Sequence, residues 1–536
     1  MDYGSPVLRR RLTVWGAAVL VLVFLVLQVS PLVNRVEEDE STSVCDAHRL
    51  VRGQVPYRDF FSLWAPVGGF VLSGWPTGWG ERPETAARYI QVILLLAAFL
   101  LLAFRFRCFD GSGSIPAMIL PIVLFPMAYF NGNHWLAILL YCGAILAAER
   151  LWHDPANKGN WLLLGFLAGT AACTMQTEGT LGALLLLFTV LTTSQNPREA
   201  VSRGGRALVG VAGAGVLWLG PLLLLGAGKR FFRDVVWWPL VNYRKPGNIV
   251  DMPFLWDLPG SLRAVWALPV GENAALHSVV ATAGTLLYVF VLMAFLTACI
   301  FSIFHLAVVV FRRRHADPAL TTASVLTLLS IGLYARVNPT WVHITYAFTP
   351  VFVLLCLVGT PGMSARLRKA LRAVLVLVLV CGAVFNCRAY LTRVHHVWEY
   401  TDVDRVDRES PLNRSLRSLP FMEKGDTVAV LPAGSKVYLY AYPPAIGYTQ
   451  LFTLDEGHYD IEDHRRVAKE IAEHLPKLVL MDKINQKGFL SKEDPISSVL
   501  KTHYSMWSQS PSVSAYVRKE LLRGFIRPTG EPGETR

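Results

Sequence analysis

The stretch DESTSVCDAHRLVRGQVPYRDFFSLWAPVGG, residues 39–69, follows the first long apolar segment of the chain. It begins with two carboxylates, Asp39 and Glu40, where a membrane-spanning helix would leave the bilayer. Ionisable groups at a membrane are costly to desolvate and are functional candidates by default. The stretch therefore predicts an external loop with chemistry at the membrane face, if the rest of the chain is embedded in a bilayer.

The composition indicates a polytopic membrane protein. Hydrophobic residues make up 53% of the 536 residues and charged residues 17%, whereas soluble domains carry about 25% charged residues. Apolar runs recur from residue 12 to residue 387, and many approach the roughly 20 residues with which a helix crosses a bilayer. The first run, 12–33, is too long for a secretory signal and no small-residue cleavage site follows it, so we expect a retained helix.

We expect about 11 membrane spans of this kind. Basic residues gather in the alternate loops that this count places on one side, which the positive-inside rule identifies as the cytoplasmic side. The N-terminus is then cytoplasmic and the C-terminal tail external. The predicted spans are 12–33, 88–104, 115–130, 135–151, 161–174, 179–193, 207–228, 279–310, 319–335, 342–359 and 370–387.

The external regions of this topology are 34–87, 229–278 and 388–536. The second is rich in aromatic residues, which suit one or two helices in the plane of the membrane interface. In the third, TVAVLPAG and KLVLMDK are typical of short strands, and DIEDHRRVAKEIAEHLP is typical of an amphipathic helix that ends at a proline. The predicted domains are a transmembrane domain over 1–387, a linker over 388–420 and a small extracytoplasmic α/β domain over 421–536.

Charge and cysteine content exclude other classes. The formal net charge of +12 does not indicate nucleic-acid binding, because the basic residues are not gathered in one domain. The eight cysteines are scattered, mostly in apolar segments, without a Cys-x-x-Cys pair or a Cys/His metal spacing. We therefore predict neither a zinc site nor a disulfide framework.

The loop after the first span resembles the GT-C superfamily of integral membrane glycosyltransferases, and more narrowly the bacterial relatives of protein O-mannosyltransferases and the lipid A aminoarabinose transferases. The residues that carry the resemblance are Asp39-Glu40, Ala47, Gly53, the segment 55–61 (VPYRDFF) and Pro66. The chain departs from the family pattern at 41–43, where relatives often have Tyr, and at 64–66, where many have Lys-Pro-Pro. These departures concern the acceptor and the subfamily.

The resemblance implies a fold, an activity and a set of partners. The fold is an all-α polytopic membrane protein of GT-C type with a small C-terminal extracytoplasmic α/β domain. The activity is transfer of a hexosyl or pentosyl group from a polyprenyl-phosphate donor to an acceptor hydroxyl on a lipid, glycan or protein, at the external face. Together with the basic cytoplasmic loops, the resemblance indicates a bacterial inner membrane.

Such a transfer needs a base, which the resemblance places in the acidic pair. A carboxylate must accept the proton of the acceptor hydroxyl as its oxygen attacks the anomeric carbon. Asp39 matches the family's first acidic position and is the predicted base, while Glu40 is the second candidate and alternatively orients substrate or binds a cation. Carboxylates are ligands for a divalent cation, but two of them do not specify one. The other reading is an ordinary solvated charge run, since residues 37–40 are all acidic.

The leaving phosphate needs cationic partners as its charge develops. The candidates are Arg58, Arg336 and Lys245, since they lie in external regions near the membrane. Arg336 is the single basic residue of the short external loops. Its guanidinium suits a phosphate, but it is equally suited to extend from a helix end to the lipid headgroups.

The predicted substrate-binding residues are further polar groups of the external face, namely Asp59, His134, Gln176, Glu178, Tyr243 and His343. Each of three sites has an alternative reading. Asp59 also suits pairing with Arg58 or capping a helix. Gln176 and Glu178 also suit simple turn chemistry, and His343 a hydrogen bond to a neighbouring helix.

Two other functions fit the same residues. A transporter or flippase of lipid-linked sugars would share the external charges, but transporters keep polar sites near the middle of the membrane, and the predicted spans here are nearly free of ionisable residues. A non-catalytic scaffold whose tail binds a partner would tolerate Asp39→Asn.

Overall fold

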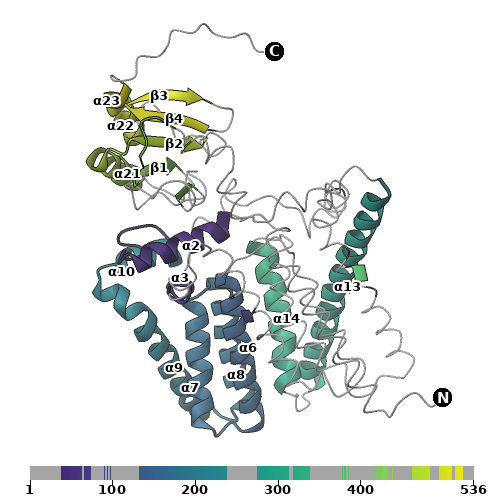
Figure 1. The fold of residues 1–536 in the computed structure, drawn as a ribbon. Helices are drawn as coiled ribbons and strands as arrows, with labels where there is room; N and C mark the ends of the chain where they lie inside the picture. The colour runs from purple at the N-terminus through teal and green to yellow at the C-terminus, as the bar shows by residue number, and fades with distance from the viewer. Residues whose placement is uncertain are drawn as a thin grey trace, which may run out of the picture. The chain divides into compact units, whose positions relative to one another are not determined.

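The computed structural model of the chain describes residues 38–62, 65–73, 132–237, 274–312, 318–337, 419–423, 425–431, 461–482, 494–509 and 513–522, with some single positions between them. The chain divides into two compact units (Figure 1). The first unit is Met1–Ala47, Trp64–Leu224 and Val250–Asp404, and the second is His48–Leu63, Leu225–Ile249 and Arg405–Arg536. The domain boundaries predicted at 387 and 421 stay predictions.

The described part of the first unit is helical. Its helices after residue 64 are α3 (Pro66–Ser73), α6 (Gly132–His153), α7 (Lys158–Ala172), α8 (Gln176–Thr193), α9 (Pro197–Leu224), α13 (Ala274–Arg312) and α14 (Pro318–Val337). Helix α7 packs against α6, α8 and α9, and α14 packs against α13 and α8. A Cβ atom on Gly165 of α7 would lie 1.9 Å from the carbonyl oxygen of Ala207 on α9. Such small residues let membrane helices approach closely.

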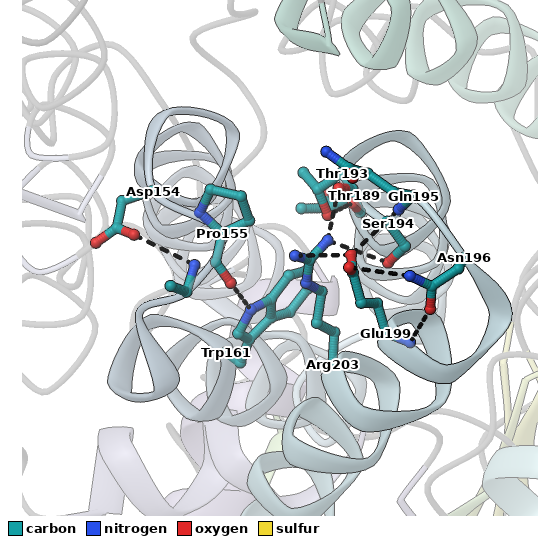
Figure 2. A network of polar contacts seen from close by, with 11 residues as sticks. Asp154, Pro155, Trp161, Thr189, Thr193, Ser194, Gln195, Asn196, Glu199 and Arg203 are labelled. Carbon is teal, nitrogen blue, oxygen red and sulfur yellow. Dashed lines mark hydrogen bonds and ion pairs between the residues drawn. The ribbon is translucent and has the colours of Figure 1, made fainter.

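The turns that join α6 to α7 and α8 to α9 are closed by their own polar groups (Figure 2). In the first turn, the indole N–H of the fully buried Trp161 donates to the carbonyl of Pro155 at 3.0 Å. In the second, the side chain of Asn196 accepts from the backbone N–H of Glu199 at 3.0 Å, and the Glu199 carboxylate accepts from the backbone N–H of Gln195 at 3.2 Å. This reciprocal pattern satisfies donors at the start of α9.

Several predicted spans fall on these helices. The predictions 135–151, 161–174, 179–193, 207–228, 279–310 and 319–335 coincide with α6, α7, α8, α9, α13 and α14. Among the described residues, three helical stretches are long and apolar enough to cross a bilayer, namely Leu136–His153, Pro197–Leu224 and His277–Val310. The chain is an integral membrane protein. The remaining predicted spans lie outside the described residues or are described only at single positions, so the number of about 11 stays a prediction.

The second unit contains a four-stranded sheet. Its strands are β1 (Val428–Leu431), β2 (Leu478–Asp482), β3 (Tyr504–Gln509) and β4 (Val513–Arg518), in the order β1-β2-β4-β3. The pair β1/β2 is parallel, with Val428 opposite Leu478, and the other two pairs are antiparallel. The helices are α21 (Ile461–His474), α22 (Pro495–His503) and α23 (Lys519–Leu522). The predicted mixed α/β fold of the tail is therefore confirmed.

The individual elements of the tail follow from local sequence. Strands β1 and β2 are the two predicted apolar segments, and α21 is the predicted amphipathic helix, which ends ahead of Pro476 with Leu475 at φ 42°. Helix α22 begins at Pro495, behind Asp494, whose carboxylate accepts from the backbone N–H of Ile496 at 2.8 Å. The sequence did not predict the β3/β4 hairpin, because its strands are rich in Ser and carry no long apolar run.

Candidate active site

The acidic pair lies in a helix at the start of the predicted external loop. Asp39 and Glu40 are the second and third residues of α2 (Glu38–Val51). The predicted external loop therefore contains a helix at this point, and the first turn of a helix is a physically favourable place for acidic residues. Unpaired backbone N–H groups and the helix dipole both stabilise negative charge there.

A glycine ends α2 at a fixed point. Gly53 has φ +80°, its N–H donates to the carbonyl of Leu50 at 2.9 Å, and the N–H of Gln54 donates to the carbonyl of Arg49 at 3.0 Å. This pair of bonds is the Schellman motif, in which a residue with positive φ satisfies the last carbonyls of a helix. The glycine that carried part of the family resemblance therefore has a backbone role.

Arg58 and Asp59 form a two-pronged ion pair. Nε and Nη2 of Arg58 donate to the two carboxylate oxygens of Asp59, each at 2.8 Å. Oδ2 of Asp59 also accepts from the backbone N–H of Val55 at 2.8 Å. The Arg58 hydrogen bonds lower the pKa of Asp59 below its ordinary value and raise that of Arg58. Asp59 thus has the structural role that the sequence left open, while the Arg58 side chain stays 44% exposed.

His134 and Glu178, predicted separately from two short loops, are brought together. Each lies in the first turn of its helix, α6 for His134 and α8 for Glu178. Nδ1 of His134 lies 3.0 Å from Oε1 of Glu178, and the two side chains are 4% and 1% exposed. The hydroxyl of Thr177 donates to the other carboxylate oxygen at 2.6 Å. This end of the helical unit therefore holds a buried, hydrogen-bonded titratable pair.

Helix α3 packs on the same end of the helical unit. The N–H of Val67 donates to the carbonyl of Cys173, in the turn before α8, at 3.1 Å. A Cβ atom on Gly68 would lie 1.4 Å from Oδ1 of Asn133. Asn133 is buried and directly precedes His134 in the sequence. The contact needs a residue without a side chain at position 68. Gln176, another predicted substrate contact, is the half-buried first residue of α8.

The remaining predicted site residues are placed only in part. Arg336 is the second-last residue of α14. Lys245, Tyr243 and His343 lie outside the described residues. Among the residues that the structure describes, no group of three or more His, Cys, Asp or Glu side chains has the arrangement of a metal site.

The site region also contains a residue that the sequence analysis missed. Arg49 on α2 is only 2% exposed, and its guanidinium carbon lies 5.1 Å from the ring centre of Phe60 and 6.0 Å from that of Tyr438. A cation over an aromatic face is a stabilising contact. The only sequence signal was its place ten residues after Asp39, in a helix whose length was not predicted.

Comparison with known proteins identifies solved structures with a similar fold. No protein-family model and no curated protein sequence matches the chain. Its structure is similar to the crystal structure of ArnT from Cupriavidus metallidurans bound to undecaprenyl phosphate, with a TM-score of 0.50 and 12% identity, over 95% of this chain and 98% of ArnT. The chain has a GT-C-like fold.

Two further solved structures are similar at a lower level. The apo state of the same ArnT gives a TM-score of 0.47 with 13% identity, over 94% of this chain and 97% of that one. The apo oligosaccharyltransferase of Archaeoglobus fulgidus gives 0.41 with 11% identity, over 94% of this chain and 74% of that one. The residues of the first loop predicted a GT-C-like fold. Of the three solved structures, the ArnT complex with undecaprenyl phosphate is the one that supports this prediction.

Proposed function

We propose that the protein is a membrane glycosyltransferase that moves a sugar from a polyprenyl-phosphate donor to an acceptor hydroxyl at the external face of the membrane. The observation that carries the proposal is the end-to-end likeness in fold to an ArnT structure that holds undecaprenyl phosphate. The acidic pair in the first turn of α2 supports it, because it lies at the predicted membrane exit. The acceptor is a lipid, a glycan or a protein.

In this mechanism Asp39 is the general base. It accepts the proton of the acceptor hydroxyl while the hydroxyl oxygen bonds to the anomeric carbon, and the bond from that carbon to the donor phosphate breaks. The first turn of α2 favours the ionised carboxylate that this role requires. Glu40 stands next to it to orient substrate or to bind a divalent cation.

The departing phosphate takes up negative charge and needs donors that are already oriented. Arg58 suits this role because Asp59 fixes two of its nitrogens while its side chain remains 44% exposed. Arg336 at the end of α14, and Lys245, are the other cations that we propose for the phosphate.

The polar end of the helical unit is proposed to contact the sugar or the acceptor. His134 and Glu178 fix one another there, and Gln176 begins α8 beside them. Tyr243 and His343 complete the proposed set. In the described helices α6 and α8 this pair lies at the helix ends rather than at their middle, which favours a transferase over a flippase, because transporters bind substrate near the bilayer midplane.

The proposal is tested by transfer of radiolabelled sugar from polyprenyl-phosphate donors in membranes that contain the protein. Asp39→Asn is expected to abolish transfer with unchanged protein level. Glu38→Gln is the matched control, because it removes the neighbouring acid of the same helix turn. Equal loss in both variants would indicate a general charge effect and remove Asp39 as the base. If the donor crosses the bilayer without sugar transfer, the protein would instead be a flippase of lipid-linked sugars. If the donor does not interact with the protein at all, the non-catalytic scaffold would be favoured.

A further inference from the structure

The first external loop supplies part of the core of the C-terminal domain. Phe61 is 6% exposed and belongs to the same buried cluster as residues of the strands and helices of the tail. The cluster includes Ala429, Leu431, Val467, Ala468, Ile471, Val479, Met481, Ile496, Leu500 and Tyr504. A side chain almost 370 residues before β1 thus fills the interior of the α/β domain, so the loop and the domain share one core.

Helix α21 also binds the backbone of that loop. Nη2 of Arg466 donates to the carbonyl oxygen of Arg58 at 2.7 Å, while its Nε donates to Glu470 one turn along α21 at 3.0 Å. Glu470 holds the guanidinium in position, so the hydrogen bond to the loop comes from a fixed donor. In turn, Nη1 of Arg58 lies within 3.4 Å of the carbonyl oxygen of Leu225.

The preceding turn of α21 binds the segment after α9. Asp463 is fully buried and accepts from both terminal nitrogens of Arg233, with Nη1 at 3.1 Å. Nη1 of Arg230 lies 3.7 Å from the same carboxylate. These arginines belong to α10 (Gly228–Phe231) and to the π-helical turn η2 (Phe232–Trp237). Because a buried carboxylate is costly without its partners, α21 and this segment are held together.

The loop itself is held in a strained conformation. Tyr57 has φ +65°, which is uncommon for a residue with a bulky side chain. Its N–H donates to the carbonyl of Phe60 at 2.7 Å, and its fully buried ring meets Phe231 edge-on at 5.2 Å. Such strain persists only when the surroundings over-determine the backbone. The contacts from α21 and α10 are those surroundings.

The strained loop begins where α2 ends. Helix α2 is uninterrupted from Glu38 to Val51, and the hydrogen-bonded Schellman motif at Gly53 connects it directly to the loop. In a single helix, a displacement of the last turn also displaces the first turn, which carries Asp39.

We propose that α21 of the C-terminal domain positions the acidic pair for the reaction, with Arg466 and Phe61 as the positioning residues. The role in the reaction rests on the proposed function, whereas the mechanical link from α21 to the loop and α2 does not. Neither residue needs to touch substrate for this role.

The mechanical link is tested by hydrogen–deuterium exchange in the full-length protein. In Arg466→Ala, amides of 54–62 and of 45–51 are expected to exchange about tenfold faster or more, because the opening free energy of the loop falls. Arg465→Ala is the matched control, since that exposed side chain bonds only to Glu462 among its described contacts. Phe61→Ala gives a second route to the same opening, and Phe61→Leu should restore most of the protection. Unchanged exchange in Arg466→Ala and Phe61→Ala would overturn the link.

The role in the reaction is tested by kinetics on the same variants. Arg466→Ala is expected to lower kcat by about 10- to 100-fold, the effect of a small displacement of a reacting group. Arg466→Lys, which keeps a donor for the Arg58 carbonyl, should recover part of kcat. Faster exchange with unaltered kcat would overturn the positioning role. If the unmodified protein transfers no sugar, the proposed function fails and the positioning role fails with it, while the exchange data still decide the link.

Discussion

Residues 48–62 and helix α3 are parts of the same predicted external loop, yet they are fixed by different kinds of contact. The first part belongs to the α/β unit and is held by side chains, from Arg466 on its backbone and from Phe231 on its Tyr57 ring. Helix α3 belongs to the helical unit, and two of its contacts are made by its backbone, through the Val67 N–H and the bare Cα of Gly68.

The comparison teaches which changes each part tolerates. A contact made by a long side chain is lost by shortening or neutralising that side chain, and its loss leaves buried polar groups or a cavity. A contact that depends on a missing side chain is lost only by adding atoms, because the neighbours are already in contact. Removal of charge should therefore loosen the α/β unit, and added volume should loosen the packing of α3.

The largest expected effect is that of Asp463→Asn in the α/β unit. The substitution leaves Arg230 and Arg233 beside a neutral amide, and breaking a buried ion pair by removing one partner costs about 3–5 kcal/mol. We expect the lower end, about 3 kcal/mol, because Arg233 is 30% exposed and Arg230 33%. Urea unfolding of the detergent-solubilised protein, monitored by hydrogen–deuterium exchange of the strand amides, measures this loss of stability.

Glu462→Gln is the control for that measurement. Glu462 precedes Asp463 on α21, but its side chain is 70% exposed and pairs with Arg465 at the surface. Surface pairs contribute about 0–1 kcal/mol. If both variants lost the same stability, the buried position of Asp463 would not be the cause.

The next effect is that of Gly68→Ala in α3. The new Cβ would lie 1.4 Å from Oδ1 of Asn133, so one of the two must move, at about 1–3 kcal/mol for such overpacking. A lower thermal unfolding midpoint is expected. Gly213→Ala on α9, where an added Cβ meets nothing within 4 Å, should leave the midpoint unchanged or slightly higher.

A double substitution sharpens the test at position 68. Asn133→Ala removes the atoms that the new Cβ would meet, so Gly68→Ala should cost less in that background than in the unmodified protein. Additive losses would show that the contact between α3 and Asn133 does not limit the packing.

Sequence patterns predicted the parts of this molecule that depend on local residues. The apolar runs at 135–151 and 207–228, the helix of 461–474 and the strand at 478–482 are of this kind. The partners of Phe61 were not predicted, because a phenylalanine in an aromatic loop looks the same whether it contacts the membrane interface or a distant core.

For the candidate site, residue types were easier to predict than their pairing. His134 and Glu178 were chosen independently as polar residues of short external loops, and only the packing of α6 against α8 brings them to 3.0 Å. Asp59 was suited to several roles, and the structure pairs it with Arg58. Contacts between distant segments depend on helix packing, which a single sequence does not encode in any local pattern.

Glu178→Gln should have a smaller effect on stability than Asp463→Asn and Gly68→Ala. Gln keeps the size and an oxygen acceptor for Nδ1 of His134, and loses the charge and the oxygen that accepts from the Thr177 hydroxyl. Hydrogen bonds between membrane helices contribute about 0.6–2 kcal/mol, so a loss of about 1 kcal/mol is expected in thermal unfolding. Thr180→Ala, an exposed position two residues along α8, is the control and should be near neutral. A control loss as large as that of Glu178→Gln would contradict a specific role for the pair.

An effect of similar size concerns pH and residues 48–62, the first part of the comparison. The pKa of Asp59 is lowered in the folded protein, chiefly by the hydrogen bonds from Arg58. Its folded form therefore binds the proton less readily than the unfolded chain does. The stabilisation is fully present above the ordinary aspartate pKa of about 3.9, and it is lost as pH falls through the lower folded value.

Asp59→Asn should remove that pH dependence. The variant is expected to be less stable by about 1 kcal/mol at neutral pH, since one acceptor of the Val55 N–H and the partner of Arg58 are weakened. As the pH is lowered below about 4, the unmodified protein should lose stability toward that of the variant. Thermal unfolding of both proteins across this range measures the difference. If the difference in stability between the two proteins stays constant as pH falls, the Asp59 carboxylate does not fix Arg58 and the loop. The polar contacts that hold residues 48–62 would then depend on Arg466.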